Sequence, residues 1–211
     1  MGEKENTKSC DSQEKKDMDS LREEIENYKP YNYQEEQDKK VFLDYLTLFD
    51  NCLERENEFG HVSSSAFILN KERTKVVMIY HNIYDAWGWV GGHADGDADL
   101  LSVAVREAKE ETGLKNVKPI DEDIFIVDIL TVSGHEKRGK YVSSHVHLNV
   151  TFLLEADEYE ALHIKEDENS GVKWVPIEQM VEVSGDPPMM YVYGKAIAKM
   201  KEQGFLNIKN R

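Results

Sequence analysis

One helix that carries three glutamates on a single face constrains the fold most strongly. Across residues 100–112, apolar side chains recur at helical spacing, and Gly113 follows where a left-handed cap ends a helix. Glu107 lies three residues before Glu110 and four before Glu111, so the three carboxylates share one face. Because the opposite face is apolar, we expect the helix to pack on a sheet and to present its carboxylates at a cleft.

The glutamate face favours a bound cation. Like charges at this spacing destabilise a helix by about 0.2–0.5 kcal/mol per pair, and acidic groups near a helix C-terminus also meet the negative end of its dipole. Mg²⁺ prefers oxygen ligands and reverses this penalty. A solvated acidic face is the alternative. The preceding pair Gly91-Gly92 favours the metal site, because glycine lets the backbone approach a ligand closely.

The apolar pattern divides the chain into three parts. Residues 1–17 are polar and predict a disordered tail, residues 18–58 predict an N-terminal helical arm, and residues 59–211 form the main domain. In the main domain the pattern predicts strands at 62–69, 75–81, 124–132, 145–154 and 172–175, and further helices at 177–183 and 189–203. Strands outnumber helices without regular alternation, which favours the α+β class with a mixed sheet.

Charge excludes several kinds of partner. Lys+Arg 26 against Asp+Glu 41 gives a net charge of −15, which argues against nucleic acid and against anionic membrane surfaces. No apolar run reaches the roughly 18 residues that span a membrane. Cys10 and Cys52 provide no disulfide framework, so we expect a reduced, cytoplasmic compartment. An anionic substrate would therefore need a divalent cation to attract it.

The segment from Gly92 to Leu114 resembles the signature of the Nudix hydrolases, G-x5-E-x7-R-E-U-x-E-E-x-G-U, where U is aliphatic. The residues that match in register are Gly92, Arg106, Glu107, Glu110, Glu111, Gly113 and Leu114. Trp87 and the glycine pair are also similar to the family's W-x-x-P-G-G lead-in, with Val90 in place of proline.

The sequence departs from this pattern at Ala98, where the family has its first glutamate. In the family that glutamate supports the site near the start of the helix, so its loss bears on site geometry more than on metal binding. Asp97 or Asp99 is expected to substitute as helix cap or as salt-bridge partner.

The resemblance implies a fold and an activity. The fold is an α/β/α sandwich around a mixed sheet over about residues 62–183, with the helical arm outside the resemblance. The activity is Mg²⁺-dependent hydrolysis, with Mn²⁺ as a second ion, of a nucleoside diphosphate linked to another group, by attack of water on phosphorus. The partner is then a small-molecule nucleotide or another diphosphate, whose identity the signature does not specify.

The resemblance also implies the site residues. The metal ligands would be Glu107, Glu110, Glu111 and Gly92. Arg106 would orient a carboxylate, most simply Glu107. Glu168 stands six residues before Trp174, a spacing similar to that of a further carboxylate that some members use as ligand or general base. A solvated acidic loop is the alternative for Glu168.

Other polar groups have two interpretations each. His145 and His147 lie on one strand face, which suits either a transition metal or the polar lining of a sheet, and they would contact substrate if that face borders the cleft. Residues 135–140 form a basic loop that suits either a phosphate clamp or a solvated hairpin tip. His93 would meet a phosphate or pack in its loop. The tryptophans suit base stacking or core packing: Trp87, Trp89 and Trp174.

Two other functions remain open on the same fold. An enzyme similar to isopentenyl-diphosphate isomerase would need an active-site cysteine, and neither Cys10 nor Cys52 lies near the signature. A non-catalytic module that binds a nucleotide or a protein would be consistent with Ala98, whereas the three retained glutamates argue against it. The amphipathic stripe from Val41 to Phe49 suggests packing on the core or in a homodimer.

Overall fold

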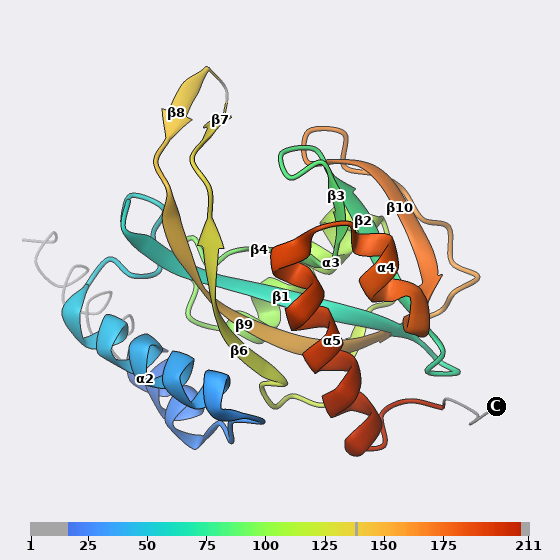
Figure 1. Ribbon diagram of the computed structural model, residues 1–211, viewed down its shortest axis with the longest axis horizontal. Helices are drawn as coiled ribbons and strands as arrows, with labels where there is room; N and C mark the ends of the chain where they lie inside the picture. Colours follow the sequence, from blue (N-terminus) through green and yellow to red (C-terminus); the bar gives the residue numbers. More distant parts are fainter. Residues whose placement is uncertain (1–16, 138, 208–211) are drawn as a thin grey trace, which may run out of the picture.

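A mixed β-sheet forms the centre of the computed structural model, which describes residues 17–137 and 139–207 (Figure 1). The main strand order is β10-β2-β1-β9-β5, with β3 paired to β2, β4 to β1 and β6 to β9. The strands are β1 (Gly60–Asn70), β2 (Lys75–His81), β3 (Ala86–Gly88), β4 (Val90–His93), β5 (Lys118–Pro119), β6 (Ile126–Val132), β9 (His145–Ala156) and β10 (Asn169–Pro176). β1 and β9 run parallel and the other pairs antiparallel, which confirms the expected mixed sheet.

Helices cover both faces of this sheet. Consecutive residues of β1 alternate between two hydrophobic clusters, because side chains along a strand point to opposite faces: Ala66 and Ile68 belong to one cluster, Phe67 and Leu69 to the other. The first cluster takes in the helical residues 17–27, α2 (Tyr33–Leu48) and α3 (Leu100–Thr112), and the second takes in η1 (Ile177–Gln179), α4 (Met180–Ser184) and α5 (Pro187–Glu202). The expected α/β/α arrangement is confirmed.

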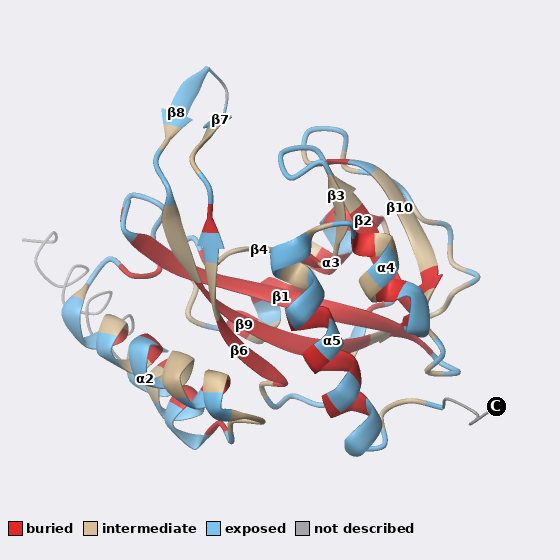
Figure 2. Cartoon of the chain, in the orientation of Figure 1, coloured by how far each residue is buried: buried red, intermediate tan, exposed pale blue. Residues whose placement is uncertain are grey.

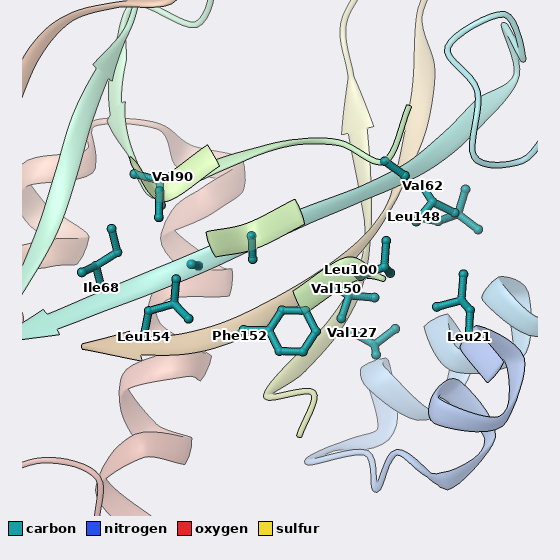
Figure 3. Packing of buried hydrophobic residues seen from close by; sticks show 14 of the residues in the cluster. Leu21, Val62, Ile68, Val90, Leu100, Val127, Leu148, Val150, Phe152 and Leu154 are labelled. Atoms are coloured by element: carbon teal, nitrogen blue, oxygen red, sulfur yellow. The ribbon is translucent and has the colours of Figure 1, made fainter. Parts of the chain in front are cut away.

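The first cluster fixes the position of α3 (Figure 3). Leu100 of α3 is buried against the sheet beside Val150 and Phe152 of β9. Each fully buried aliphatic side chain of this size stabilises the fold by about 1.5–3 kcal/mol. Figure 2 shows that β1 and much of β9 are buried along their length, so α3 rests on the most enclosed part of the molecule.

The arm shares the first cluster with the main domain. Phe42 and Leu46 of α2 are buried, whereas Val41 and Leu48 are 48% and 73% exposed. The expected stripe was therefore wrong at these two positions, because α2 turns the row that contains Phe42 and Leu46 toward the sheet. The division into a tail, an arm and a main domain at residues 17, 58 and 59 stays a prediction, and the tail from 1 to 16 lies outside the described residues.

Short elements were not predicted. β5 and the hairpin of β7 (His135–Lys137) and β8 (Lys140–Val142) are too brief to carry a periodic signal. The hairpin projects beyond the sheet, above the ends of β6 and β9 (Figure 1). β10 begins at Asn169, earlier than expected, because its first residues pair with the end of β2 across a bulge. Within the described residues, no helix is both long and apolar enough to cross a membrane.

Candidate active site

The helix α3 has well-defined ends. Asp99 caps its start by accepting a hydrogen bond from the backbone N–H of Ser102 at 3.0 Å. Gly113 ends it in the left-handed conformation, with φ at +73°. The first turn is tied to β1, since the hydroxyl of Ser64 donates to the carbonyl of Leu100 at 2.6 Å. The glutamate face is therefore held in a fixed register relative to the sheet.

Asp97 and Asp99 lie on either side of Ala98, where the family has a glutamate, and each makes a different contact. Asp99 is the helix cap, and Asp97 is the ion-pair partner, with its Oδ2 3.5 Å from Nη1 of Arg106. The other terminal nitrogen of Arg106 lies 3.7 Å from Oε1 of Glu107. Ala98 packs against the first hydrophobic cluster instead of reaching the site. Arg106 thus lies between Asp97 and Glu107, and its role in orienting Glu107 stays a prediction.

Glu111 is the most enclosed of the three glutamates, with 2% of its surface exposed. Its Oε2 accepts a hydrogen bond from the backbone N–H of Gly91 at 2.9 Å. Burial raises the pKa of Glu111 to about 8, because the charged form loses its hydration. Burial, and then the nearby charge of Glu110, also raise the pKa of Glu107.

Lys165 connects Glu110 of α3 to the loop before β10. Its Nζ lies 2.9 Å from Oε2 of Glu110 and 3.0 Å from Oε2 of Glu168. Burial lowers the pKa of Lys165, but its hydrogen bonds to the two carboxylates outweigh burial, and the pKa stands above its ordinary value. Asn169, which is fully buried, anchors this loop by donating from Nδ2 to the backbone carbonyl of Glu111 at 3.0 Å. Glu168 is thereby held beside the glutamate face of α3.

A pocket opens beside these groups, between β3, β4, β9 and α5. Its lining includes Glu111, the glycine pair, Trp87 and Tyr193. It also includes polar side chains: Asn149 of β9 accepts from the hydroxyl of Ser63 at 3.0 Å and from that of Ser65 at 2.8 Å. Of the three glutamates of α3, Glu111 therefore lines a pocket that combines aromatic and polar side chains, as small-molecule sites usually do.

The tryptophans have different surroundings. Trp174 packs against the first hydrophobic cluster, and Trp89 lies edge-on to Phe67 and Tyr193 in the second. Trp87 lines the pocket, with the ammonium of Lys173 3.8 Å from the centroid of its ring. Core packing thus holds for Trp174, whereas Trp89 both packs in the second cluster and lines the pocket, as Trp87 does.

The strand face that carries His145 and His147 borders the pocket. His147 and His93 both belong to its lining. The hairpin of residues 135–142 is largely exposed, and Lys137 contributes positive charge toward His93 and His81.

Sequence reasoning missed two features beside the site. His61, near the start of β1, lies next to His147, because the parallel register pairs their Cα atoms. Arg55 forms a two-point ion pair with Asp95 in the loop between β4 and α3. Neither has a local sequence signal, since both depend on pairing between segments far apart in the chain.

The donor set suits a hard cation. Carboxylate oxygens of three glutamates on adjacent turns, one of them buried with a raised pKa, lie beside a backbone that two glycines bring close. Ions such as Mg²⁺ take oxygen ligands of this kind, usually together with water and phosphate.

Comparisons with known proteins found a matching family and several similar proteins. The family model described as the NUDIX domain matches residues 60–195. The RNA pyrophosphohydrolase of Pelagibacter ubique (strain HTCC1062) is 28% identical over 139 residues, covering 64% of this chain and 87% of that protein. A C. elegans Ap4A hydrolase in a binary complex has 19% identity and a TM-score of 0.48, covering 67% of this chain and 98% of that one. The NUDIX domain of Shewanella oneidensis NrtR, complexed with ADP ribose, has 16% identity and a TM-score of 0.48, covering 74% and 97%.

Proposed function

Since this chain belongs to the Nudix family of hydrolases, we propose that it hydrolyses a phosphoanhydride bond in a nucleoside diphosphate linked to another group. The reaction would depend on Mg²⁺, with Mn²⁺ as a substitute. The ion would be held by Glu107, Glu110 and Glu111, and the backbone of Gly92 would be a further ligand.

The buried carboxyl of Glu111 carries this proposal. It lines the pocket, and its charged form is disfavoured by burial and then by the neighbouring charge of Glu107. A buried carboxyl of this kind destabilises the folded protein, and it is expected where it binds a ligand. A hard divalent cation at this place would favour the ionised form of Glu111 and relieve the repulsion among the three glutamates.

Each residue would have a distinct task. A bound divalent ion neutralises the diphosphate oxygens and acidifies a water molecule that attacks phosphorus. Arg106 is a positioning residue that holds Glu107, while the N–H of Gly91 fixes the carboxylate of Glu111. Glu168, held near Glu110 through Lys165, would serve as an additional ligand or as the general base.

The isomerase and the non-catalytic binding module are not equally well supported as alternatives. For an isomerase, the cysteine is misplaced: Cys52 is buried near the end of the arm, where its carbonyl accepts from the N–H of Val62, and it is not among the described residues that line the pocket. A non-catalytic binding module remains the second candidate, because the exchange of a glutamate for Ala98 is the change such a module would tolerate. Turnover by the purified protein separates the two.

The substrate is a further part of the proposal. The relative named RNA pyrophosphohydrolase brings RNA into consideration, but a net charge of −15 favours a small molecule over a nucleic acid. Trp87 at the pocket wall offers a face on which a base would stack. A cytoplasmic location and a homodimer stay predictions.

A panel of diphosphate compounds tests the activity. The panel would contain a sugar nucleotide, a dinucleoside polyphosphate, a nucleoside triphosphate, a lipid diphosphate and an RNA, each with Mg²⁺ or Mn²⁺, and release of phosphate or monophosphate would be measured. We expect turnover of at least one small molecule, and a loss of about 10²-fold or more in kcat for Glu110→Gln combined with Glu111→Gln.

Glu182→Gln in α4 is the matched control, because it removes one exposed carboxylate of the same kind away from the pocket. It should keep the activity of the parent. If the double variant turned over substrate like the parent, the assignment of the site would be wrong. Tight binding of a nucleotide without turnover of any compound would support the binding module instead.

A further inference from the structure

Four histidines from three strands gather beside the pocket, and two of them, His93 and His147, line it. His61 lies in β1, His93 in β4, and His145 and His147 in β9. The parallel register pairs His61 with His147, and strand alternation puts His145 on the same face. The ring centroid of His61 lies 5.0 Å from those of His145 and His147 and 4.8 Å from that of His93.

Backbone carbonyls orient two of these rings. Nδ1 of His61 lies 3.3 Å from the carbonyl of Asn57, and Nδ1 of His145 lies 2.8 Å from the carbonyl of Ser143. A carbonyl oxygen only accepts, so each Nδ1 carries a proton, and in the neutral ring each Nε2 presents a lone pair. Metal-binding histidines are held in this way, by a hydrogen bond from the ring nitrogen that does not touch the metal.

The lone pair of His61 has no partner. His61 is 5% exposed, and its Nε2 is a buried polar atom without a hydrogen bond. Such an atom costs the folded state about 1–3 kcal/mol unless something binds it. Two more potential ligand atoms lie close to it: one ligand atom from each of His61, His145 and His147 lies within 4.8 Å of the other two.

The contact between His145 and His147 also favours a bound metal ion. Their Nε2 atoms lie 3.3 Å apart. When His145 is neutral, its Nε2 presents a lone pair, and the contact then holds together without a metal only if His147 places its proton between the two atoms. A metal ion would replace that proton and take both lone pairs.

We propose that His61, His145 and His147 bind one divalent transition-metal ion, with Zn²⁺ the ion they fit best. Three imidazole nitrogens with a fourth position open suit Zn²⁺, and they do not suit Mg²⁺, which prefers oxygen. His93 is at hand for the fourth position, since its ring lies 4.9 Å from that of His147. The site is therefore chemically distinct from the three glutamates of α3.

The location of the site makes the ion part of the pocket wall. His93 and His147 line the same pocket as Glu111. An ion held by His147 would face a ligand that occupies the pocket, where it would meet an anionic or nitrogen-containing group.

Cobalt binding to the full-length protein, prepared without a histidine tag and stripped of metal by a chelator, tests the proposal. Co²⁺ replaces Zn²⁺ in such sites and gives visible absorption from its d electrons. In the presence of excess Mg²⁺ we expect one Co²⁺ per chain and loss of the absorption when Zn²⁺ is added. His147→Gln and His61→Gln should each weaken binding at least about tenfold.

The controls separate this site from the glutamate site. His163→Gln changes an exposed histidine outside the cluster and should bind Co²⁺ like the parent. Glu110→Gln with Glu111→Gln should also retain it, whatever that variant does to hydrolysis. His145→Gln, at a partly exposed position, serves if His61→Gln does not fold by circular dichroism. Absence of cobalt absorption in the parent, or unchanged binding in folded His147→Gln and His145→Gln, would overturn the proposal and leave a hydrogen-bonded histidine lining.

Discussion

Gly92 of β4 packs directly against the side chain of Glu107 in α3: a Cβ atom on Gly92 would lie 2.7 Å from Oε1 of Glu107. The atom in the way is the end of a side chain, so the backbone has no need to move. We expect Gly92→Ala to fold and to displace the carboxylate of Glu107. A shift of about 1 Å in a positioned group costs on the order of 10²-fold in kcat, and the half-saturating concentration of Mg²⁺ should rise.

Gly194 provides the matched control for this prediction. It lies in α5, where an added Cβ meets no atom within 4 Å. Gly194→Ala should raise the free energy of unfolding by about 0.5–1 kcal/mol, because alanine is the better helix former, and should leave kcat unchanged. Metal titration and thermal unfolding of both variants check the pair. A Gly92→Ala protein with the parent's kcat and metal affinity would exclude the close packing as a requirement of the site.

Lys165 competes with a metal ion for the same carboxylates. Its ammonium contacts Glu110 and Glu168, so a cation that binds there has to displace it or tolerate its charge. We expect Lys165→Gln to lower the half-saturating concentration of Mg²⁺ by about two- to fivefold, the size of effect that partly exposed charges produce, and to do so less at high salt. Lys173→Gln, which removes the ammonium over Trp87, should leave that concentration unchanged. Weaker Mg²⁺ binding by Lys165→Gln would mean that the lysine supports the site.

The raised pKa of Glu111 predicts how stability changes with pH. In the unfolded chain the carboxyl has a pKa of 4.5, and in the folded, metal-free protein about 8. Below pH 4.5 both states are protonated. Between 4.5 and 8 the unfolded state releases the proton and the folded state retains it, so the contribution of Glu111 to stability falls as pH rises.

Thermal unfolding in a chelator between pH 5 and 8 tests this sign. The melting temperature of the parent should fall relative to that of Glu111→Gln as the pH rises, and added Mg²⁺ should reverse the trend, because the metal binds the ionised form. The melting temperature of Glu182→Gln should match that of the parent at every pH. Parallel curves for the parent and Glu111→Gln would show that Glu111 is already ionised without metal.

The sequence predicted the helix α3 to the residue, because its apolar period, its cap and Gly113 are all local signals. It left open whether Asp97 or Asp99 would be the helix cap or the salt-bridge partner, since the choice depends on the loop conformation. The spacing of the three glutamates predicted that they share one helix face, and their joint role as metal ligands stays a prediction. The family resemblance alone suggested that Glu168 lies near the site. In the structure this position depends on the loop before β10, which folds back on α3.

The histidine cluster marks the limit of such reasoning. His145 and His147 were visible as a pair on one face, because alternation along a strand is local. His61 joins them only through the parallel pairing of β1 with β9, a contact between segments more than 80 residues apart. The register of that pairing depends on the whole hydrophobic pattern of both strands, so no short motif could have predicted it.

The arm is tied to the main domain by buried charges. Glu35 of α2 is fully buried, with its Oε1 3.0 Å from Nζ of Lys195 in α5 and its Oε2 accepting from the hydroxyl of Tyr28. Lys195 also pairs with the buried carboxylate of Asp128 in β6. Nζ of Lys199 also lies 3.9 Å from Oε2 of Glu35. Lys195 is the cation that pairs with both carboxylates, and it connects the arm, the sheet and α5.

Removing that cation should be costly. Lys195→Met leaves Glu35 and Asp128 buried without it, and loss of one partner from a buried ion pair costs about 3–5 kcal/mol. For a chain of this size we expect a fall in melting temperature on the order of 10 °C. Adding Glu35→Gln to Lys195→Met should restore part of the loss, because one uncompensated charge then disappears, whereas Lys201→Met, at an exposed position of the same helix, should change stability by less than about 0.5 kcal/mol. If Lys195→Met and Lys201→Met had the same melting temperature, the buried charges would not hold the arm in place. Apolar contacts such as those of Phe42 would then hold it alone.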